Sequence, residues 1–497
     1  PAFERCVKEA GVEGVMGGYN RLNGEAACGS HHLITEILRE KWGFDGYYVS
    51  DCGAIKDFHM HHGLTDTPQE SAALALKSGC DLNCGAVYLH VMSAYNQGLV
   101  SEDDIDRAVT HLMMTRMRLG MFDQHTEFDE IPYEVNDCAE HHSLALKAAE
   151  ESMVLLKNDG ILPLDKTKLK TVAVIGPNSD SEEILKGNYN GTATEKYTLL
   201  EGIRAVLGKD TRIFCSEGAH LYRDNVENLA EADDRIKEAV SMAMRSDVVF
   251  LCLGLNGTLE GEEGDANNSY AGADKVDLNL PESQMRLLKA VCETGTPVIL
   301  LLSTGSAMAI SDADEHCSAI LHVWYPGQMG GLAAARLLMG EAVPSGRLPV
   351  TFYRTTEELP DFTDYSMKGR TYRYMEHEAL YPFGYGLSYG DFEYSNLKAE
   401  QIETGQVKLS VEITNHSMFE CDEVAQVYVR ITDSELAAPG GSLADFKRIH
   451  LKAGESAAAA FILSAKVFMV VNEEGEFVFD GSAAVVTCGG SQPDGRS

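Results

Sequence analysis

Two acidic positions of the sequence follow apolar runs, where side chains are placed to do chemistry. Asp51 comes directly after the apolar residues 46–50, and Gly53 follows it in a turn. In parallel α/β architectures, active-site residues come from the carboxyl ends of strands. Aspartate is also a preferred N-cap residue of helices. Position alone therefore leaves two interpretations of Asp51, a strand-to-helix cap or a catalytic carboxylate.

The second acidic position is the stretch of residues 259–265, which follows the apolar run 248–253. It holds Glu260, Glu262 and Glu263, with glycines between and after them. Open α/β sheets bind ligands beyond the carboxyl ends of their strands. The stretch is a solvated loop, a cation site or part of an active site, although the regular Asp-x-Asp-x-Asp-Gly spacing of a calcium loop is absent.

The composition indicates a globular protein of several domains. The chain has 497 residues, of which 44% are hydrophobic, and this length favours about three domains. A net charge of −35 disfavours a nucleic-acid partner, which needs clustered Lys and Arg. No window approaches about 18 uninterrupted apolar residues, so we expect no membrane-spanning helix. A homodimer is compatible with the sequence, and no segment of it indicates a compartment.

The pattern of strands and helices changes twice along the chain. Residues 1–125 alternate short strands with helices, which is typical of parallel βα units. Since a closed (β/α)8 barrel needs eight units, we expect this region to be the C-terminal part of a barrel whose earlier part precedes Pro1. The next α/β region predicts an open, doubly wound sheet, and the last hundred residues predict a small β-sandwich. The expected divisions are a partial barrel 1–125, a connector 126–165, an α/β sandwich domain 166–352, a junction 353–390 and a β-sandwich 391–497.

The expected elements follow from apolar runs and capping residues. Ser101 with Asp104 predicts the start of an amphipathic helix that Gly120 ends. The strands expected in the first two regions are residues 14–19, 46–50, 171–176, 248–253, 297–302 and 319–323. The other expected helices are residues 33–41, 69–78, 230–245 and 282–293. The strands expected in the sandwich are residues 407–413, 423–431, 457–463 and 477–486.

Several sequence motifs resemble those of glycoside hydrolase family 3. They occur in the same order as in the family and are spread over nearly the whole chain. Val15-Met16-Gly17-Gly18-Tyr19-Asn20 and the stretch from Trp42 to Asp51 are similar to the closing part of the family's barrel. Residues 151–158 and 162–164 resemble its domain connector, and further similar words are residues 324–328, 344–351 and 381–387. The last hundred residues are similar to the family's fibronectin type III-like domain.

The resemblance implies roles for individual residues. Asp51 is at the position of the catalytic nucleophile, and Tyr19 is at that of the tyrosine beside it. The loop near Glu260 corresponds to the segment that supplies the general acid/base. We favour Glu260 because Thr258-Leu259-Glu260 best resembles the family's Thr-x-Glu-x-Glu word, with Glu262 as the runner-up.

A retaining glycosidase needs these two carboxyl groups about 5–5.5 Å apart, on opposite sides of the scissile bond. The resemblance therefore implies a site at a domain interface, completed when the acidic loop closes over the sugar. The glutamate must be protonated first, and a neighbouring carboxylate such as Glu262 or Glu263 is a plausible source of a raised pKa.

The residue after Asp51 indicates the subtype. Many members that act on glucosides carry Trp there, whereas this chain has Cys52. Ala27-Cys28 and residues 50–55 resemble the β-xylosidase branch, in which the two cysteines look like a pair packed near the sugar. The resemblance thus implies Cys28 and Cys52 as substrate-binding residues. Two reduced, buried thiols are the alternative.

The function implied by the resemblance is a retaining exo-β-glycosidase, foremost a β-D-xylosidase acting on xylo-oligosaccharides. A β-glucosidase or an α-L-arabinofuranosidase is the alternative within the family, and an inactive carbohydrate-binding fragment is the alternative outside enzymes. The expected partner is a small oligosaccharide or glycoside, without a cofactor. Metal ligation by the histidines at 31–32 and 59–62 or by Cys80 with Cys84 is disfavoured because no metal-site spacing supports it. A dinucleotide site after residue 176 is disfavoured because the second and third glycines of that fingerprint are missing.

Overall fold

The computed structural model of the chain describes residues 2–187, 190–223, 233–260, 275, 277–403 and 405–493. The chain divides into two compact units, Pro1–Val135 and Asn136–Ser497. Asp51 belongs to the first unit and Glu260 to the second. Glu262 and Glu263 lie outside the described residues.

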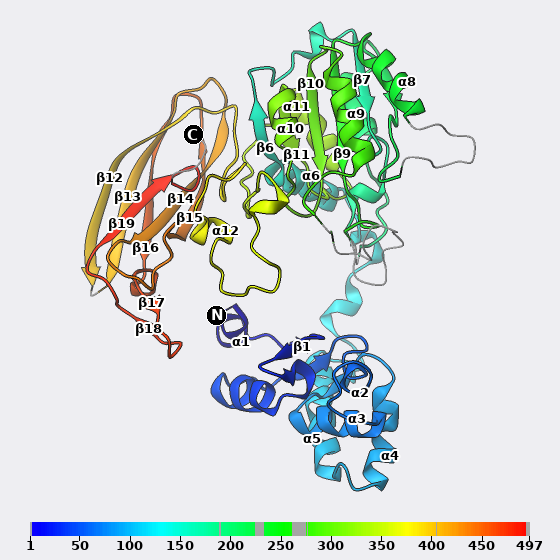
Figure 1. Ribbon diagram of the computed structural model, residues 1–497, viewed down its shortest axis with the longest axis vertical. Coiled ribbons are helices and arrows are strands. Elements are labelled where there is room, and N and C mark those ends of the chain that lie inside the picture. The colour runs from blue at the N-terminus through cyan, green and yellow to red at the C-terminus, as the bar shows by residue number, and fades with distance from the viewer. Residues whose placement is uncertain are drawn as a thin grey trace. The chain divides into compact units, whose positions relative to one another are not determined.

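The first unit contains βα units around three parallel strands (Figure 1, blue to cyan). The strands β1 (Gly14–Gly17), β4 (Tyr47–Ser50) and β5 (Leu82–Asn83) lie in the order β1-β4-β5, with β4 in the middle. The other elements of this unit are α1 (Ala2–Lys8), β2 (Arg21–Leu22), β3 (Glu25–Ala26), η1 (Ala27–Gly29), η2 (His32–Lys41), α2 (Asp57–Met60), α3 (Pro68–Ser78), η3 (Val87–His90), α4 (Val91–Asn96), α5 (Glu102–Arg118), η4 (Glu127–Glu130) and η5 (Tyr133–Val135). This partly barrel-like architecture agrees with the expected fold.

Capping residues set the helix boundaries of this unit. Ser101 accepts from the backbone N–H of Asp104, and the Asp104 carboxylate accepts from that of Ser101, which confirms the predicted capping box of α5. Thr67 and Glu70 form the same arrangement at the start of α3. The expected helix 33–41 is η2, whose hydrogen bonds have the wider π spacing. The packed faces of η2 and α2 include Ile34, Leu38 and Phe58, which are nearly inaccessible to solvent.

Among the described residues, the first part of the second unit contains a six-stranded sheet. Its order is β6-β11-β10-β9-β7-β8, and β6 alone among these strands is antiparallel to its neighbour. The strands are β6 (Val154–Asn158), β7 (Thr171–Ile175), β8 (Arg212–Ser216), β9 (Val248–Gly254), β10 (Val298–Ser303) and β11 (Ala319–His322). Every residue of β9, β10 and β11 is buried, because helices cover both faces of the sheet.

Two helix layers form the two hydrophobic cores of this sheet. One core contains side chains of α8 (Asp234–Ala243), α9 (Glu282–Cys292) and α10 (Ser311–His316). The other contains side chains of α6 (Ala139–Ser152), α7 (Leu199–Leu207) and α11 (Gly330–Leu338). The doubly wound prediction is confirmed. The segment 126–165, expected as a connector, supplies both α6 and the edge strand β6.

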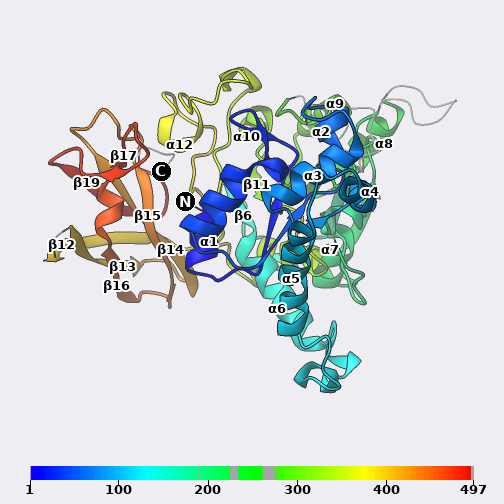
Figure 2. The same ribbon diagram turned by 90° about the horizontal axis from the view of Figure 1, so that it is seen from below.

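A β-sandwich follows the short elements η8 (Thr356–Glu358) and α12 (Thr371–Tyr374), and both views show its strands grouped together (Figures 1 and 2, orange to red). One sheet has the order β12-β13-β16 and the other β15-β14-β19. The strands are β12 (Phe392–Glu403), β13 (Gln406–Asn415), β14 (Cys421–Ile431), β15 (Ser442–Leu451), β16 (Ser456–Leu463) and β19 (Ala484–Gly489), with a small pair β17 (Val470–Val471) and β18 (Phe477–Val478). The single strand expected over 477–486 is wrong, because the chain forms two strands there that belong to different sheets: β18 pairs with β17, and β19 pairs with β14.

Candidate active site

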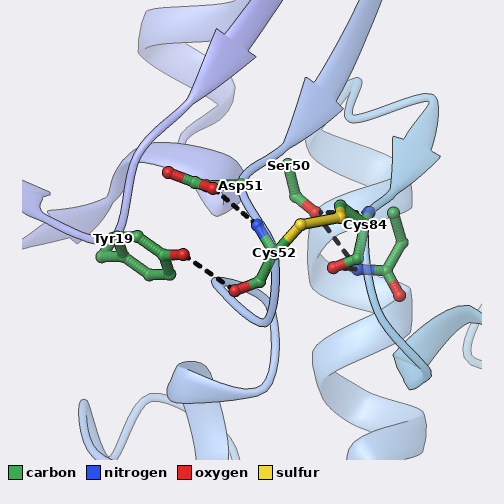
Figure 3. The surroundings of a disulfide bond; sticks show 6 residues. Tyr19, Ser50, Asp51, Cys52 and Cys84 are labelled. Carbon is green, nitrogen blue, oxygen red and sulfur yellow. Dashed lines mark hydrogen bonds between the residues drawn. A yellow bond between two sulfur atoms is a disulfide. The ribbon is translucent and has the colours of Figure 1, made fainter. Parts of the chain in front are cut away.

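Asp51 directly follows β4, the central strand of the first unit. Its backbone N–H donates to the Gly17 carbonyl at 2.8 Å, which continues the hydrogen bonding between β1 and β4 by one residue. Its carboxylate Oδ1 accepts from the Cys52 N–H at 2.7 Å (Figure 3). The residue is partly exposed, and its side chain forms no ion pair with a described Lys, Arg or His. A carboxylate held by a single backbone donor keeps lone pairs available for a reaction.

A disulfide ties the loop of Asp51 to the next strand. Cys52 is bonded to Cys84, 32 residues later, which directly follows β5 (Figure 3). The Gly53 N–H donates to the Cys84 carbonyl at 2.8 Å, and Ser50 Oγ accepts from the Cys84 N–H at 3.1 Å. Asn83 Nδ2 also donates to Ser50 Oγ at 3.1 Å, so a disulfide and three hydrogen bonds join the carboxyl ends of β4 and β5 beside the Asp51 carboxylate.

The expected pair of Cys28 and Cys52 is wrong. Cys28 is a free thiol with no exposed surface, and it donates to the Gly17 carbonyl at 3.2 Å. A hydrogen bond with the Cys80 thiol lowers the pKa of Cys28. No sequence pattern indicates Cys84 as the partner of Cys52, because only the parallel pairing of β4 with β5 brings the two residues close.

Tyr19 contacts the residue after Asp51. Its side chain is 44% exposed, and its hydroxyl donates to the Cys52 carbonyl at 2.9 Å (Figure 3). The Cys52 peptide is thus held on three sides, by Tyr19, by the disulfide and by the bond to Asp51. Tyr19 thus holds the peptide group that directly follows the one whose N–H bonds the Asp51 carboxylate.

Glu260 lies in quite different surroundings, shortly after β9. Its Oε2 accepts from the Gly305 N–H at 2.7 Å and from the Tyr325 hydroxyl, and its Oε1 accepts from the Ser306 hydroxyl. Lys275 Nζ lies 3.6 Å from Oε1, and only 10% of the Glu260 side chain is exposed. Both oxygens of the Glu260 carboxylate therefore have hydrogen-bond partners.

Burial and the Glu260 charge together raise the pKa of Tyr325, so its hydroxyl stays protonated and donates. Tyr325, Ser306 and Lys275 were not identified from the sequence as site residues. Of these three residues, only Tyr325 could have been identified from the sequence, since it is part of the family-like motif at residues 324–328.

A buried histidine lies at the same edge of the sheet. His322, at the end of β11, has no exposed surface, and its Nδ1 lies 3.0 Å from the Leu302 carbonyl. Burial lowers the pKa of His322 to about 4, so the ring is neutral at pH 7. Its ring centroid lies 3.9 Å from that of Trp324, whose backbone has φ +57°. A tryptophan in this left-handed region is held there by its surroundings.

Aromatic side chains of the junction between the α/β sheet and the sandwich pack against one another. Tyr381 and Tyr385 are buried and stacked, and Tyr372 stacks on Phe383. The described residues contain no group of three or more His, Cys, Asp or Glu side chains arranged to hold a metal ion. No described helix combines the length and the apolar character needed to cross a membrane.

Three family models match the chain. The N-terminal domain of glycosyl hydrolase family 3 matches residues 1–115, and the family's C-terminal domain matches residues 153–389. A fibronectin type III-like domain matches residues 423–492. The matches follow the order of the partial barrel, the α/β sheet and the sandwich.

Individual relatives agree with these matches. A xylan 1,4-beta-xylosidase of Xylanibacter ruminicola is 31% identical, in an alignment that covers 92% of this chain and 69% of the relative. The solved structure of an exo-beta-xylosidase of family GH3, XlnD, in complex with a xylobiose aziridine probe has a TM-score of 0.87 and 27% identity over 97% of this chain and 64% of its own. The solved β-glucosidase EmGH1 of Erythrobacter marinus has a TM-score of 0.86 and 30% identity over 99% of this chain and 68% of its own.

Proposed function

Because the chain belongs to glycoside hydrolase family 3, we propose that it acts as a retaining exo-β-glycosidase on xylo-oligosaccharides, releasing single xylose units from the non-reducing end. The observation that carries the proposal is the carboxylate of Asp51 at the end of β4. It is partly exposed, has one backbone donor, and lies beside the Cys52–Cys84 disulfide.

In the first half of the reaction, an Asp51 oxygen attacks the anomeric carbon and forms a covalent glycosyl ester. The bond from that carbon to the leaving oxygen breaks, its electron pair stays with the oxygen, and a carboxylic acid of the enzyme protonates it. In the second half, the same group, now a carboxylate, takes a proton from water. The water oxygen attacks the anomeric carbon, and the ester bond to Asp51 breaks. The mechanism requires both carboxyl groups at one glycosidic bond.

The general acid/base of this proposal comes from residues 260–263, and the contacts of Glu260 favour Glu262 over it. A general acid must carry a proton and release it towards the substrate in every turnover. Glu260 is instead surrounded by three hydrogen-bond donors and a lysine. Glu262, the runner-up from the sequence, is therefore the acid/base that we propose.

The disulfide supports the preference for xylose. A pentose has no hydroxymethyl group, so its pocket is filled at that side by the protein. Cys52 and Cys84 form a compact, rigid group next to Asp51, where Trp follows the nucleophile in many glucoside-specific members. A β-glucosidase is the second candidate, favoured by the likeness to the β-glucosidase EmGH1.

The test of the catalytic proposal is covalent trapping of the full chain. A 2,4-dinitrophenyl 2-deoxy-2-fluoro-β-xyloside should inactivate the enzyme with release of one dinitrophenolate. Peptide mapping should then find the sugar on Asp51. A label on another carboxylate would contradict the assignment of Asp51.

The test of the substrate is a comparison of p-nitrophenyl β-xyloside, β-glucoside and α-L-arabinofuranoside on one preparation. We expect the highest kcat/KM for the xyloside. A glucoside cleaved at least about tenfold faster, which corresponds to 1.4 kcal/mol of transition-state binding, would make the β-glucosidase candidate the better one.

A further inference from the structure

A cavity of the second unit lies between the carboxyl edge of the α/β sheet and the sandwich. Its volume is about 570 Å³, and pockets for small ligands commonly measure about 300–1,000 Å³. It is lined wholly by described residues of the second unit. The lining includes Ser152, Trp324 and Tyr325 from the α/β part, and Val424, Phe446 and Arg448 from the sandwich.

The α/β wall of this cavity contains a rigid tryptophan. Trp324 follows β11 in the left-handed backbone region, with φ +57°. Its indole Nε1 donates to the Ser152 carbonyl at 3.0 Å, and its ring packs against that of His322 at a centroid distance of 3.9 Å. Because these contacts fix the ring in the free protein, a ligand that stacks on it does not have to order it.

The sandwich wall contains a phenylalanine that is largely open to solvent. Phe446 lies on β15, the outer strand in the order β15-β14-β19, and is 61% exposed. The register of β15 against β14 shifts at Ala444, just before Phe446, and such bulges re-aim the side chains next to them. Side chains alternate along a strand, so Phe446 and Arg448 lie on the same face, and both line the cavity.

Arg448 connects the two walls. Its Nη1 donates to Ser345 Oγ at 2.7 Å and to Asp422 Oδ2 at 3.1 Å, and its Nη2 donates to the Glu151 carbonyl at 3.4 Å. Ser345 and Glu151 belong to the α/β part, whereas Asp422 lies on β14 of the sandwich. One guanidinium therefore keeps the walls at a fixed separation. The Glu151 carboxylate and the Ser152 hydroxyl, which also line the cavity, can bond hydroxyl groups of a ligand.

A pyranose ring matches this lining. In β-xylopyranose the C–H groups point to the two faces of the ring, and the hydroxyls lie around its edge. The faces can pack on the aromatic rings of Trp324 and Phe446, while the hydroxyls meet the carboxylate, hydroxyl and guanidinium groups of the same lining.

The position of the cavity relates it to the proposed reaction. Tyr325 lines it, and the Tyr325 hydroxyl donates to Glu260 at the carboxyl edge of the sheet, where open α/β proteins bind their ligands. An exo-acting glycosidase that releases single sugars accepts only one sugar on the non-reducing side of the scissile bond. All further sugars of its substrate therefore lie on the leaving-group side.

We propose that this cavity binds a xylose unit on the leaving-group side of a xylo-oligosaccharide, with Phe446 stacked on the sugar ring. The inference rests on the proposed glycosidase function and adds a determinant of its substrate. It gives the sandwich a part in substrate recognition, since Phe446 and Arg448 come from β15.

The experiment compares two substrates on the full chain and its variants. β-Xylosyl fluoride has a leaving group of one atom, which does not fill the cavity, whereas xylotriose carries two sugars on that side. For Phe446→Ala we expect the ratio of the two kcat/KM values, xylotriose over fluoride, to fall by about 3- to 10-fold, as for the loss of one aromatic stacking contact. The loss should appear as a higher KM for xylotriose, because the stacked sugar is bound in the ground state and in the transition state alike.

Two further variants sharpen the result. Phe446→Tyr keeps an aromatic ring and should keep the wild-type ratio. Phe479→Ala is the matched control, since Phe479 is 55% exposed in the same sandwich and does not line the cavity. Its ratio should equal that of the wild type. All the replaced side chains are largely exposed, so Tm should be similar throughout.

Two results would overturn the inference. One is a wild-type ratio in Phe446→Ala. The other is an equal fall in Phe446→Ala and Phe446→Tyr, because the ring would then not be what binds the sugar. Both results leave the proposed function intact, provided that the wild-type chain hydrolyses β-xylosyl fluoride. A wild-type chain that hydrolyses neither substrate would overturn the proposed function together with this inference.

Discussion

Asp51 and Glu260 are both carboxylates at the carboxyl ends of parallel strands, yet their surroundings are opposite. Asp51 accepts one hydrogen bond, from the Cys52 N–H, and is partly exposed. Glu260 accepts three hydrogen bonds, pairs with Lys275 and is almost buried. The rigidity around Asp51 is in the backbone, through the disulfide and Tyr19, whereas at Glu260 the carboxylate itself is immobilised.

The difference teaches how to separate a reacting carboxylate from a positioning one. A nucleophile needs free lone pairs and a fixed main chain, so its neighbours must hold the peptide and leave the oxygens open. A carboxylate that holds loops together instead needs hydrogen-bond partners on both of its oxygens. Position after a strand does not distinguish them, because both residues have it.

Replacing the nucleophile should give the largest effect. Asp51→Ala removes the group that forms the glycosyl ester, so we expect kcat to fall by at least about 10⁴-fold. Azide added to this variant should yield the α-configured glycosyl azide, detected by NMR. The control is Asp45→Ala, since Asp45 is a largely exposed carboxylate of the same unit that pairs with Arg118 at 3.2 Å. An equal loss in both variants would remove the contrast drawn here.

Removing the Cys52–Cys84 disulfide tests whether a fixed main chain next to Asp51 contributes to stability and selectivity. Cys84→Ser frees the Cys52 loop, and we expect the free energy of unfolding to fall by about 2–4 kcal/mol. Selectivity for xyloside over glucoside should fall too, because the rigid group beside Asp51 is lost. Denaturant titration and the ratio of the two kcat/KM values measure these effects. Cys6→Ser, at an exposed free cysteine, is the control and should change neither.

Acid should destabilise the edge of the sheet near Glu260 through His322. The folded protein keeps this ring neutral to about pH 4, whereas the unfolded chain protonates it near 6.5. The unfolded state therefore binds more protons, and stability from this group is present above pH 6.5 and is lost as the pH falls towards 4. We expect a loss of about 2–3 kcal/mol over that interval.

Urea unfolding followed from pH 7 to 4 checks this expectation. His322→Asn, which cannot be protonated, should remove that part of the pH dependence. An unchanged dependence would assign the acid sensitivity to other groups.

The smallest expected effect is at Tyr19. Tyr19→Phe removes the hydrogen bond to the Cys52 carbonyl and leaves the ring, so we expect a loss of about 0.5–1.5 kcal/mol, up to about tenfold in kcat/KM. The disulfide remains and still holds the loop. Tyr133→Phe, at a tyrosine that is 83% exposed, should have no effect. A loss at Tyr19 as large as that at Asp51 would place its hydroxyl in contact with the substrate.

The sequence predicted most strands of the α/β sheet to within a few residues. β9, β10 and β11 are covered on both faces, so they are continuous apolar runs. β12 and β15 were not predicted, because each pairs on one side only and carries many polar residues. Edge strands of this kind lack the alternation of apolar and polar residues that reveals a strand.

By itself, the sequence determined the three kinds of patterned region and the two acidic positions that follow strands. It also placed Tyr19 near Asp51, through resemblance. Only the tertiary structure decided that Cys52 is bonded to Cys84 and that Glu260 is surrounded by Gly305, Ser306 and Tyr325. Both facts depend on which strand ends are neighbours across a parallel sheet. Neighbouring parallel strands are connected through intervening helices and loops, so residues that meet at their ends are far apart along the chain.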